Sequence, residues 1–291
     1  FVGHHDFSEL FMAVVGIAAA AIPEGLPAVM TITLAIGVQA MARRNAIVRR
    51  LPAIEAIGSV AVICTDKTGT LTRNEMVVVT VEAPAGTFEI TGQGYAPLGT
   101  VSPAGDLSRL ALAAALCNDA ALRQDGGQWS VEGDPMEGAL LAFAGKVGVA
   151  PARRRLDAVP FDSRHRFMAV LTEAAAGPAT THVKGAPERV LRMCAGLDQE
   201  HWHQRADIMA RRGLRVLALA ERAERGARID GAALEGGLTF LGLLGLIDPP
   251  RPEAIAAVAE CRAAGIRVKM ITGDHAATAA AIARQSGLAN A

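Results

Sequence analysis

Apolar and polar positions divide the chain into two regions of different character. Residues 10–41 form one long apolar run that carries a single charged side chain, Glu24. A helix needs roughly 20 apolar residues to cross a bilayer, so this run predicts a transmembrane helix. After it, apolar segments of strand and helix length alternate, separated by Gly, Pro and Asp. That pattern predicts a water-soluble region that contains both helices and strands.

A short apolar run at residues 60–63 predicts a buried strand of a parallel sheet, and polar residues 66–72 follow it directly. Catalytic groups in open α/β sheets lie just beyond the carboxyl ends of strands, which is the position of Asp66. A carboxylate there can attack a phosphoryl group, Lys67 can offset the charge, and Gly69 lets the backbone approach closely. On these residue types alone, an Asx turn capped by threonines is the alternative.

The last part of the chain repeats the order of a strand followed by a polar loop. Residues 238–247 predict a strand that ends at Asp248-Pro249-Pro250-Arg251, and residues 266–271 predict one that ends at Thr272-Gly273-Asp274. Helices are expected at residues 252–264 and 275–286. A β-α-β-α order implies parallel strands with right-handed crossovers. The 272–274 loop before a helix is a ready anion site, with a simple helix cap as the alternative.

Residues 76–247 have an α+β pattern and are predicted to be an insertion between the two pieces of a doubly wound domain. Strands are expected at residues 76–81, 167–172, 181–184 and 215–220, and helices at 107–118, 137–147, 187–194 and 199–212. The predicted organisation is therefore a membrane helix (1–45), a first part of the doubly wound domain (46–75), the insertion (76–247) and a second, truncated part (248–291).

Charge and cysteine content exclude several classes of protein. The formal net charge is zero at pH 7, which gives no reason to expect a nucleic-acid partner. The four cysteines are far apart and form no CxxC pair, so neither a zinc site nor a disulfide framework is expected. A reducing cytosol suits the polar region.

Prolines and a carboxylate interrupt the middle of the long apolar run, in the segment Ile22-Pro23-Glu24-Gly25-Leu26-Pro27. Proline removes helical hydrogen bonds and frees carbonyls, and an ionisable residue at membrane depth is expensive and usually functional. Such oxygen groups suit a hard cation, while a kinked helix with a neutral or paired Glu24 is an equal alternative. Arginines at 43, 44, 49 and 50 place everything after about residue 42 in the cytoplasm.

The seven residues 66–72 resemble the phosphorylation motif of P-type ATPases, ion pumps related in fold to the haloacid-dehalogenase phosphatases. The resemblance implies an α/β fold, with an incomplete haloacid-dehalogenase-like doubly wound parallel sheet, an inserted nucleotide-binding domain and one N-terminal transmembrane helix. It implies that Asp66 is phosphorylated by ATP and that Asp66 and Thr68 hold Mg²⁺. The catalytic residues it implies are Asp66, Lys67, Thr68, Thr272, Gly273 and Asp274.

Patches of the insertion resemble the nucleotide-binding domain of the same family. Residues 133–140 resemble the segment whose Glu contacts adenine, and residues 160–168 resemble the segment whose Phe stacks on it. Residues 184–188 match the pocket lysine motif. Taken singly, Phe161 is an ordinary core residue and Glu137 an ordinary helix start. The ATP-binding residues that the resemblance implies are Glu137, Phe161, Arg166, Lys184, Arg215, Arg251, Thr68, Thr272, Gly273 and Asp274.

The Pro-Glu-Gly-Leu-Pro motif resembles the fourth membrane helix of the calcium-pump-like branch. There the carbonyls that match Ala19, Ala20 and Ile22, and the carboxylate that matches Glu24, coordinate the ion. Residues 10–41 contain no cysteine, which argues against copper or zinc. Calcium is the cation that the resemblance implies, although sodium, manganese and proton relatives share much of the pattern.

The resemblance extends from Leu10 to Gly287 and implies the central part of an ATP-driven cation pump. Its partners are then the lipid bilayer, the remaining membrane helices and an actuator domain. We expect this stretch alone to bind ATP weakly or moderately, to form little aspartyl-phosphate and to transport nothing. The alternatives are a membrane-tethered phosphatase, which usually has a second aspartate where this chain has Thr68, and a non-catalytic ATP-binding module.

Overall fold

The computed structural model describes residues 6–50, 52–174, 177–224, 226–273 and 276–288, except for the side chains of residues 21–24, 232–233 and 277. By its internal contacts the chain separates into two compact units. The first comprises Phe1–Ile63 with Gly265–Arg267, and the second comprises Cys64–Ala264 with Val268–Ala291.

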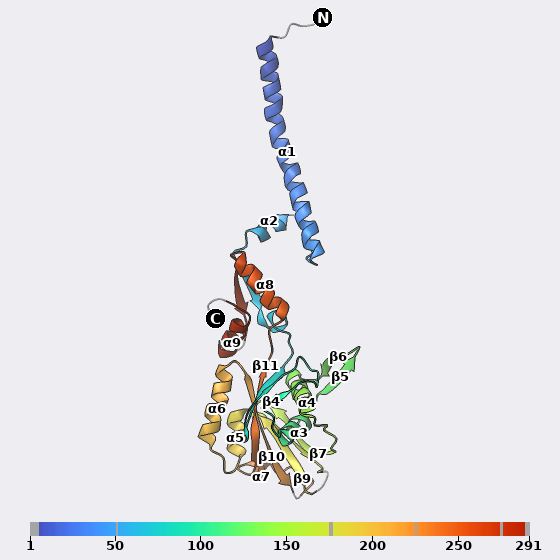
Figure 1. The fold of residues 1–291 in the computed structure, drawn as a ribbon, viewed down its shortest axis with the longest axis vertical. Helices are drawn as coiled ribbons and strands as arrows, with labels where there is room; N and C mark the ends of the chain where they lie inside the picture. Colours follow the sequence, from blue (N-terminus) through green and yellow to red (C-terminus); the bar gives the residue numbers. More distant parts are fainter. Residues whose placement is uncertain (1–5, 51, 175–176, 225, 274–275, 289–291) are drawn as a thin grey trace. The chain divides into compact units, whose positions relative to one another are not determined.

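The first unit is dominated by α1 (Phe7–Arg43), drawn in blue in Figure 1. Among the described residues, α1 is the one helix whose length and composition suit a membrane crossing. Its helical path continues through Pro23 and Pro27. Each proline removes one N–H, but the neighbouring turns keep theirs and hold the path. A short helix, α2 (Pro52–Gly58), follows.

The second unit contains an eight-stranded sheet in the order β4-β3-β2-β11-β10-β9-β8-β7 (Figure 1). Every neighbouring pair of strands in it is antiparallel. The strands are β2 (Val77–Ala83), β3 (Gly86–Ile90), β4 (Val101–Ser102), β7 (Arg155–Asp162), β8 (Phe167–Thr172), β9 (Ala179–Gly185), β10 (Arg215–Glu224) and β11 (Thr239–Ile247).

Helices cover both faces of this sheet. On one face α3 (Ser108–Leu116) and α4 (Pro135–Val147) bury Phe143 and Leu140 against Leu244 of β11. On the other, α5 (Pro187–Met193) and α6 (Gln199–Arg211) pack with Leu243. Successive side chains of a strand point to opposite faces, which is why Leu243 and Leu244 enter different cores. A short helix, α7 (Gly231–Leu234), and a separate hairpin of β5 (Ala121–Asp125) and β6 (Gln128–Glu132) complete this part.

One predicted strand belongs to a different sheet than expected. Residues 238–247 were assigned from sequence to the parallel sheet, but β11 lies between β2 and β10 and is antiparallel to both. That assignment is wrong. A strand with helices on both faces is apolar at nearly every position, whether its neighbours run parallel or antiparallel, so the apolar run alone could not distinguish the two cases.

The segment that contains Asp66 forms β1 (Val62–Asp66), which pairs with β12 (Arg267–Ile271) in a two-stranded sheet. The loop Lys67–Leu71 follows β1, and helices α8 (Pro252–Ala263) and α9 (Ala276–Gln285) flank β12 in the sequence. Every residue of β1 is partly or largely exposed, so the expectation of a buried strand is wrong. With β12 as the one paired strand among the described residues, little surface of β1 is covered.

Candidate functional site

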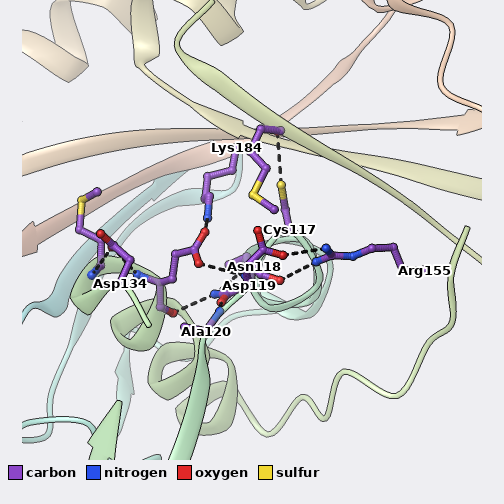
Figure 2. Close-up of polar contacts among 11 residues, drawn as sticks. Cys117, Asn118, Asp119, Ala120, Asp134, Arg155 and Lys184 are labelled. Atoms are coloured by element: carbon purple, nitrogen blue, oxygen red, sulfur yellow. Dashed lines mark hydrogen bonds and ion pairs between the residues drawn. The ribbon is translucent and has the colours of Figure 1, made fainter. Parts of the chain in front are cut away.

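A buried ion pair joins the sheet to α4. The Nζ atom of Lys184, on β9, lies 2.6 Å from Oε1 of Glu137, and the side chains are 8% and 16% exposed (Figure 2). Charges are rarely buried unless they are paired. The structure therefore brings together two residues that sequence analysis selected from separate segments, 47 positions apart.

The start of α4 fixes the position of Glu137. The Asp134 carboxylate caps the helix by accepting hydrogen bonds from the backbone N–H groups of Met136 (2.8 Å) and Glu137 (3.2 Å), and Pro135 occupies the first turn. Gly138 comes next because a Cβ atom there would lie 2.1 Å from the Val131 side chain. The glycine thus lets β6 pack directly on the helix beside Glu137.

A turn at residues 117–120 holds the other side of Glu137. The backbone N–H of Asp119 donates to Oε2 of Glu137 (3.0 Å), and the Asn118 side chain donates to the Glu137 carbonyl (2.8 Å). Arg155, at the start of β7, donates to Oδ1 of Asp119 (2.7 Å) and to the Asn118 carbonyl (2.6 Å). Figure 2 shows these contacts converging beside Lys184.

Cys117 anchors the same turn to the sheet. Its thiol is fully buried and donates to the Met168 carbonyl (3.3 Å), and burial raises the pKa of the thiol to about 12. Sequence analysis missed Cys117, Asn118, Asp119 and Arg155 as parts of this site. The sequence signal that could have found them was the pair of polar residues, Asn118 and Asp119, that follows the apolar helix and Cys117.

Phe161 lies at the same level of the sheet as Lys184. Met168 on β8 pairs with Lys184, and the register shift in β7 between Val159 and Asp162 leaves Pro160 and Phe161 together opposite Met168. Two strand spacings, roughly 10 Å, therefore separate the backbones of Phe161 and Lys184. Phe161 is 62% exposed, which is unusual for a large aromatic side chain. The alternative that Phe161 is a core residue is wrong.

Two arginines lie at one end of the sheet. Arg166 precedes β8 and forms an exposed ion pair with Glu188 (3.0 Å), and its backbone adopts a positive φ of 59°. Gly185 permits this close turn, since a Cβ atom there would lie 2.5 Å from the Arg166 carbonyl. Arg215 begins β10 and pairs with Leu246, two residues before Asp248. Both cations are therefore near the end at which the chain leaves the sheet.

Hydrogen bonds join the segment just before β2 to the segment just after β11. The Thr72 hydroxyl donates to Oδ2 of Asp248 (2.6 Å), and the backbone N–H of Glu75 donates to Oδ1 (3.2 Å). Arg251 donates from Nε to the Thr72 carbonyl (2.9 Å) and from a terminal nitrogen to the Gly69 carbonyl (3.1 Å). The contacts found for Arg251 thus go to the backbone of the 66–72 segment.

Asp66 is exposed at the carboxyl end of β1, while Lys67 beside it is buried. Gly69 has a φ of +73°, which a residue with a side chain rarely adopts and which lets the loop turn back. Thr68 is exposed in the same loop. Thr272 and Gly273 follow β12, the strand that pairs with β1. Asp274 lies outside the described residues.

The residues expected to bind a cation lie in α1. Ala19 and Ala20 are exposed on it, whereas the side chains of Ile22 and Glu24 lie outside the described part. Within the described residues, no group of three or more His, Cys, Asp and Glu side chains is arranged to hold a metal ion.

Comparison with known families identifies the class of protein. A family model described as "P-type ATPase, cytoplasmic domain N" matches residues 106–253, which include Glu137, Phe161 and Lys184. The chain therefore belongs to the P-type ATPase family.

Individual relatives agree with this assignment. The chain is 47% identical to "Cation-transporting ATPase pma1" of Synechocystis, over 97% of this chain and 34% of that protein. It is 39% identical to "Calcium-transporting ATPase" of Bacillus subtilis, over 96% and 34%. It is 41% identical to "Calcium-transporting ATPase type 2C member 1" of Bos taurus, over 97% and 31%. The chain thus spans about a third of the length of these relatives.

Proposed function

We propose that this chain is part of an ATP-driven cation pump in which ATP binds to residues 76–247 and phosphorylates Asp66. The observation that carries the proposal is the buried pair of Lys184 and Glu137, which lies level with the exposed Phe161 inside the region that matches the family. An exposed aromatic ring two strands from a paired lysine and carboxylate offers a stacking surface and polar contacts within the reach of one nucleotide.

Each of these residues has a distinct task in the proposal. The adenine ring stacks on Phe161, and its 6-amino group donates to Glu137. Lys184 lies beside the bound nucleotide and offsets negative charge. Arg166 and Arg215 lie toward the end of the sheet from which the chain continues to Asp66, so they face the phosphates.

Asp66 is the proposed nucleophile. A carboxylate oxygen attacks the γ-phosphorus in line, the bond from that phosphorus to the β–γ bridging oxygen breaks, and ADP leaves with the electron pair. Lys67 and the backbone at Gly69 stabilise the charge on the transferred group. Positioning and electrostatics supply most of the rate in phosphoryl transfer, which suits a site with few reactive groups.

In the proposal β1 and β12 run parallel, which would bring the second half of this site into place. The backbone N–H of Arg267, at the start of β12, donates to the carbonyl of Ala61, just before β1 (2.9 Å). Strands that start side by side end at the same edge, so Thr272 and Gly273 would lie beside Asp66. We propose that both strands belong to a haloacid-dehalogenase-like doubly wound parallel sheet.

The residues at this edge also fit a magnesium ion. Mg²⁺ takes one or two carboxylates, substrate phosphates and waters rather than a complete protein cage. The Asp66 carboxylate and an oxygen of Thr68 are exposed and supply hard ligands of this kind. When bound, the ion would neutralise charge on the phosphates.

We propose that α1 crosses the membrane, with residues after about 42 on the cytoplasmic side, and that it carries part of the cation site. Pro23 has no backbone N–H to donate to the carbonyl of Ala19, so that oxygen is available to a ligand. With the carbonyls of Ala20 and Ile22 and the carboxylate of Glu24, it gives oxygen ligands suited to Ca²⁺. Two relatives carry calcium transport in their names, which supports this choice of cation.

Phosphorylation of the full-length pump tests the proposal. We expect ³²P transfer from [γ-³²P]ATP to give an acid-stable, hydroxylamine-sensitive label that Ca²⁺ stimulates. Asp66→Asn should abolish the label, whereas Asp106→Asn, at an exposed position before α3, should retain it. A label that survives Asp66→Asn would refute the nucleophile. Stimulation by Mn²⁺ or Na⁺ with no response to Ca²⁺ would agree with a cation pump and would show that Ca²⁺ is not the transported ion.

A further inference from the structure

We propose that Arg155 is a positioning residue for nucleobase choice, and that it acts on Glu137 through the 117–120 turn. This inference rests on the proposed ATP site. In that site Glu137 is the group that distinguishes adenine from other bases, so whatever fixes the Glu137 carboxylate also sets the selectivity.

Arg155 grips the turn at two points. It donates to the side chain of Asp119 (2.7 Å) and to the backbone carbonyl of Asn118 (2.6 Å). A planar guanidinium that holds a carboxylate and a carbonyl at once constrains orientation as well as distance. The Asn118 side chain also accepts from the N–H of Ala120 (2.8 Å), so the turn is fixed from both ends.

The 117–120 turn then orients Glu137. Oε2 of Glu137 accepts from the backbone N–H of Asp119 (3.0 Å), while Oε1 faces Nζ of Lys184 (2.6 Å). Both carboxylate oxygens thus have fixed donors, one on each side. These two donors restrain the carboxylate plane. Arg155 holds the turn to the edge strand β7, and Cys117 holds it to β8.

A fixed carboxylate discriminates between purines. It can only accept hydrogen bonds, so the 6-amino group of adenine, a donor, fits it. The 6-oxo group of guanine is an acceptor and would face the carboxylate with no proton between them. Sites with fixed hydrogen-bonding groups reject the wrong partner because polar groups are left unpaired. If Glu137 could turn away, much of that penalty against guanine would disappear.

The neighbouring Arg154 provides a matched control. It directly precedes the same edge strand and also forms an ion pair, but its partner is Glu173, which follows β8. Among the described residues, its ion pair is with Glu173, whereas Arg155 bonds to the 117–120 turn. A general loss of stability at this edge would follow from either substitution, whereas a change in base selectivity should follow from Arg155 alone.

The test uses the whole 291-residue chain in detergent micelles. A fluorescent ATP analogue is bound and then displaced by ATP or by GTP, and the ratio of the two dissociation constants is compared among variants. We expect Arg155→Gln to reduce the preference for ATP over GTP about tenfold, the order of one hydrogen bond to a charged group. Arg155→Lys should give an intermediate ratio, because it keeps the positive charge but not the two parallel N–H donors of a guanidinium. Arg154→Gln should give the ratio of the wild type.

The outcomes separate the inference from the function on which it rests. If the wild type prefers ATP but Arg155→Gln keeps the same ratio, or Arg154→Gln changes it equally, the positioning role is wrong and the ATP site stands. If the wild type binds neither nucleotide, the ATP site itself fails. Should Arg155→Gln not fold, Asp119→Asn carries the test, because it weakens the Arg155 contact and keeps the N–H that holds Glu137.

Discussion

The ammonium of Lys184 and the carboxylate of Glu137 face each other at 2.6 Å, with neither side chain more than 16% exposed. The contact joins β9 to the first turn of α4. Removing two charges from water is costly, and only a close partner with further hydrogen bonds offsets that cost. The pair should therefore affect the free energy of unfolding, which can be measured without any nucleotide.

Breaking this pair from one side should destabilise the fold more than removing both charges. Glu137→Ala leaves Lys184 buried without a partner and is expected to lower the free energy of unfolding by about 3 kcal/mol. The double variant Glu137→Leu/Lys184→Met should recover much of that loss. Urea denaturation followed by tryptophan fluorescence measures both. Equal loss in the single and double variants would mean that the ion pair is not what holds α4 to β9.

The free energy of unfolding should depend on pH through one buried histidine, His182. His182 is 1% exposed on β9, and desolvation, reinforced by Arg153, lowers its pKa from 6.5 to about 4 despite Glu221 at 3.6 Å. The folded state thus favours the neutral ring. Stability from this group is complete above pH 6.5 and is lost as the pH falls toward 4, by at most about 1.4 kcal/mol per pH unit.

Unfolding free energies measured at pH 7.5 and pH 5 test this. His182→Gln should flatten the acid limb of the profile, while His201→Gln, at an exposed position on α6, should leave it unchanged. An acid limb that is identical in wild type and His182→Gln would assign the titration to other groups.

Local patterns predicted the main helices and five of the sheet strands of residues 76–247, but they missed β3, β4, β5, β6, β7 and α7. The helix opened by Asp134 and the strand of residues 167–172 follow from capping and from apolar runs, and both are present. Strand β7 was missed because it is an edge strand whose side chains are only partly covered, so it lacks a clear alternation. That omission hid the fact that Phe161 and Arg155 share one strand.

The site was predictable only where short segments carry the signal. Glu137 and Lys184 lie in short, characteristic segments, and the occurrence of those segments together, in the order of the family, selected them. The contact of Arg155 with Asp119 joins residues 36 positions apart through a turn and an edge strand, and no local pattern encodes such a meeting. Tertiary packing, rather than propensity, decides which polar residues after α3 face the site.

The cysteines should differ sharply in reactivity. Burial raises the pKa values of Cys117 and Cys194 to about 12, whereas Cys64 is exposed. Because the thiolate is the reactive form, iodoacetamide at pH 8 should modify Cys64 in the folded chain and reach the other two only after unfolding. Peptide mass spectrometry before and after urea treatment shows the order. Rapid labelling of Cys117 without urea would contradict the packing around the turn.

The Arg251 contacts should control access to the segment that leads into the sheet. Arg251→Ala removes the hydrogen bonds to the carbonyls of Thr72 and Gly69, which lie just before a trypsin site at Arg73. Two such bonds are worth about 1–2 kcal/mol together, so local opening and cleavage after Arg73 should be roughly tenfold faster. Arg262→Ala, on α8, serves as the control. Equal cleavage rates in the two variants would argue that Arg251 does not restrain this segment.

Phe161 offers the cleanest separation of binding from stability. Its ring is 62% exposed, so replacing it removes little packing, and Phe161→Ala should change the free energy of unfolding by less than about 0.5 kcal/mol. If adenine stacks on it, the same substitution should weaken ATP binding about tenfold or more, because stacking of a base on an aromatic ring contributes roughly 1–3 kcal/mol. Phe161→Trp keeps a stacking surface and should retain most of the affinity. Isothermal titration of ATP into each variant, alongside urea denaturation, gives both quantities from one preparation. A loss of stability that matches the loss of affinity would instead make Phe161 a packing residue, and unchanged ATP binding in Phe161→Ala would remove it from the nucleotide site.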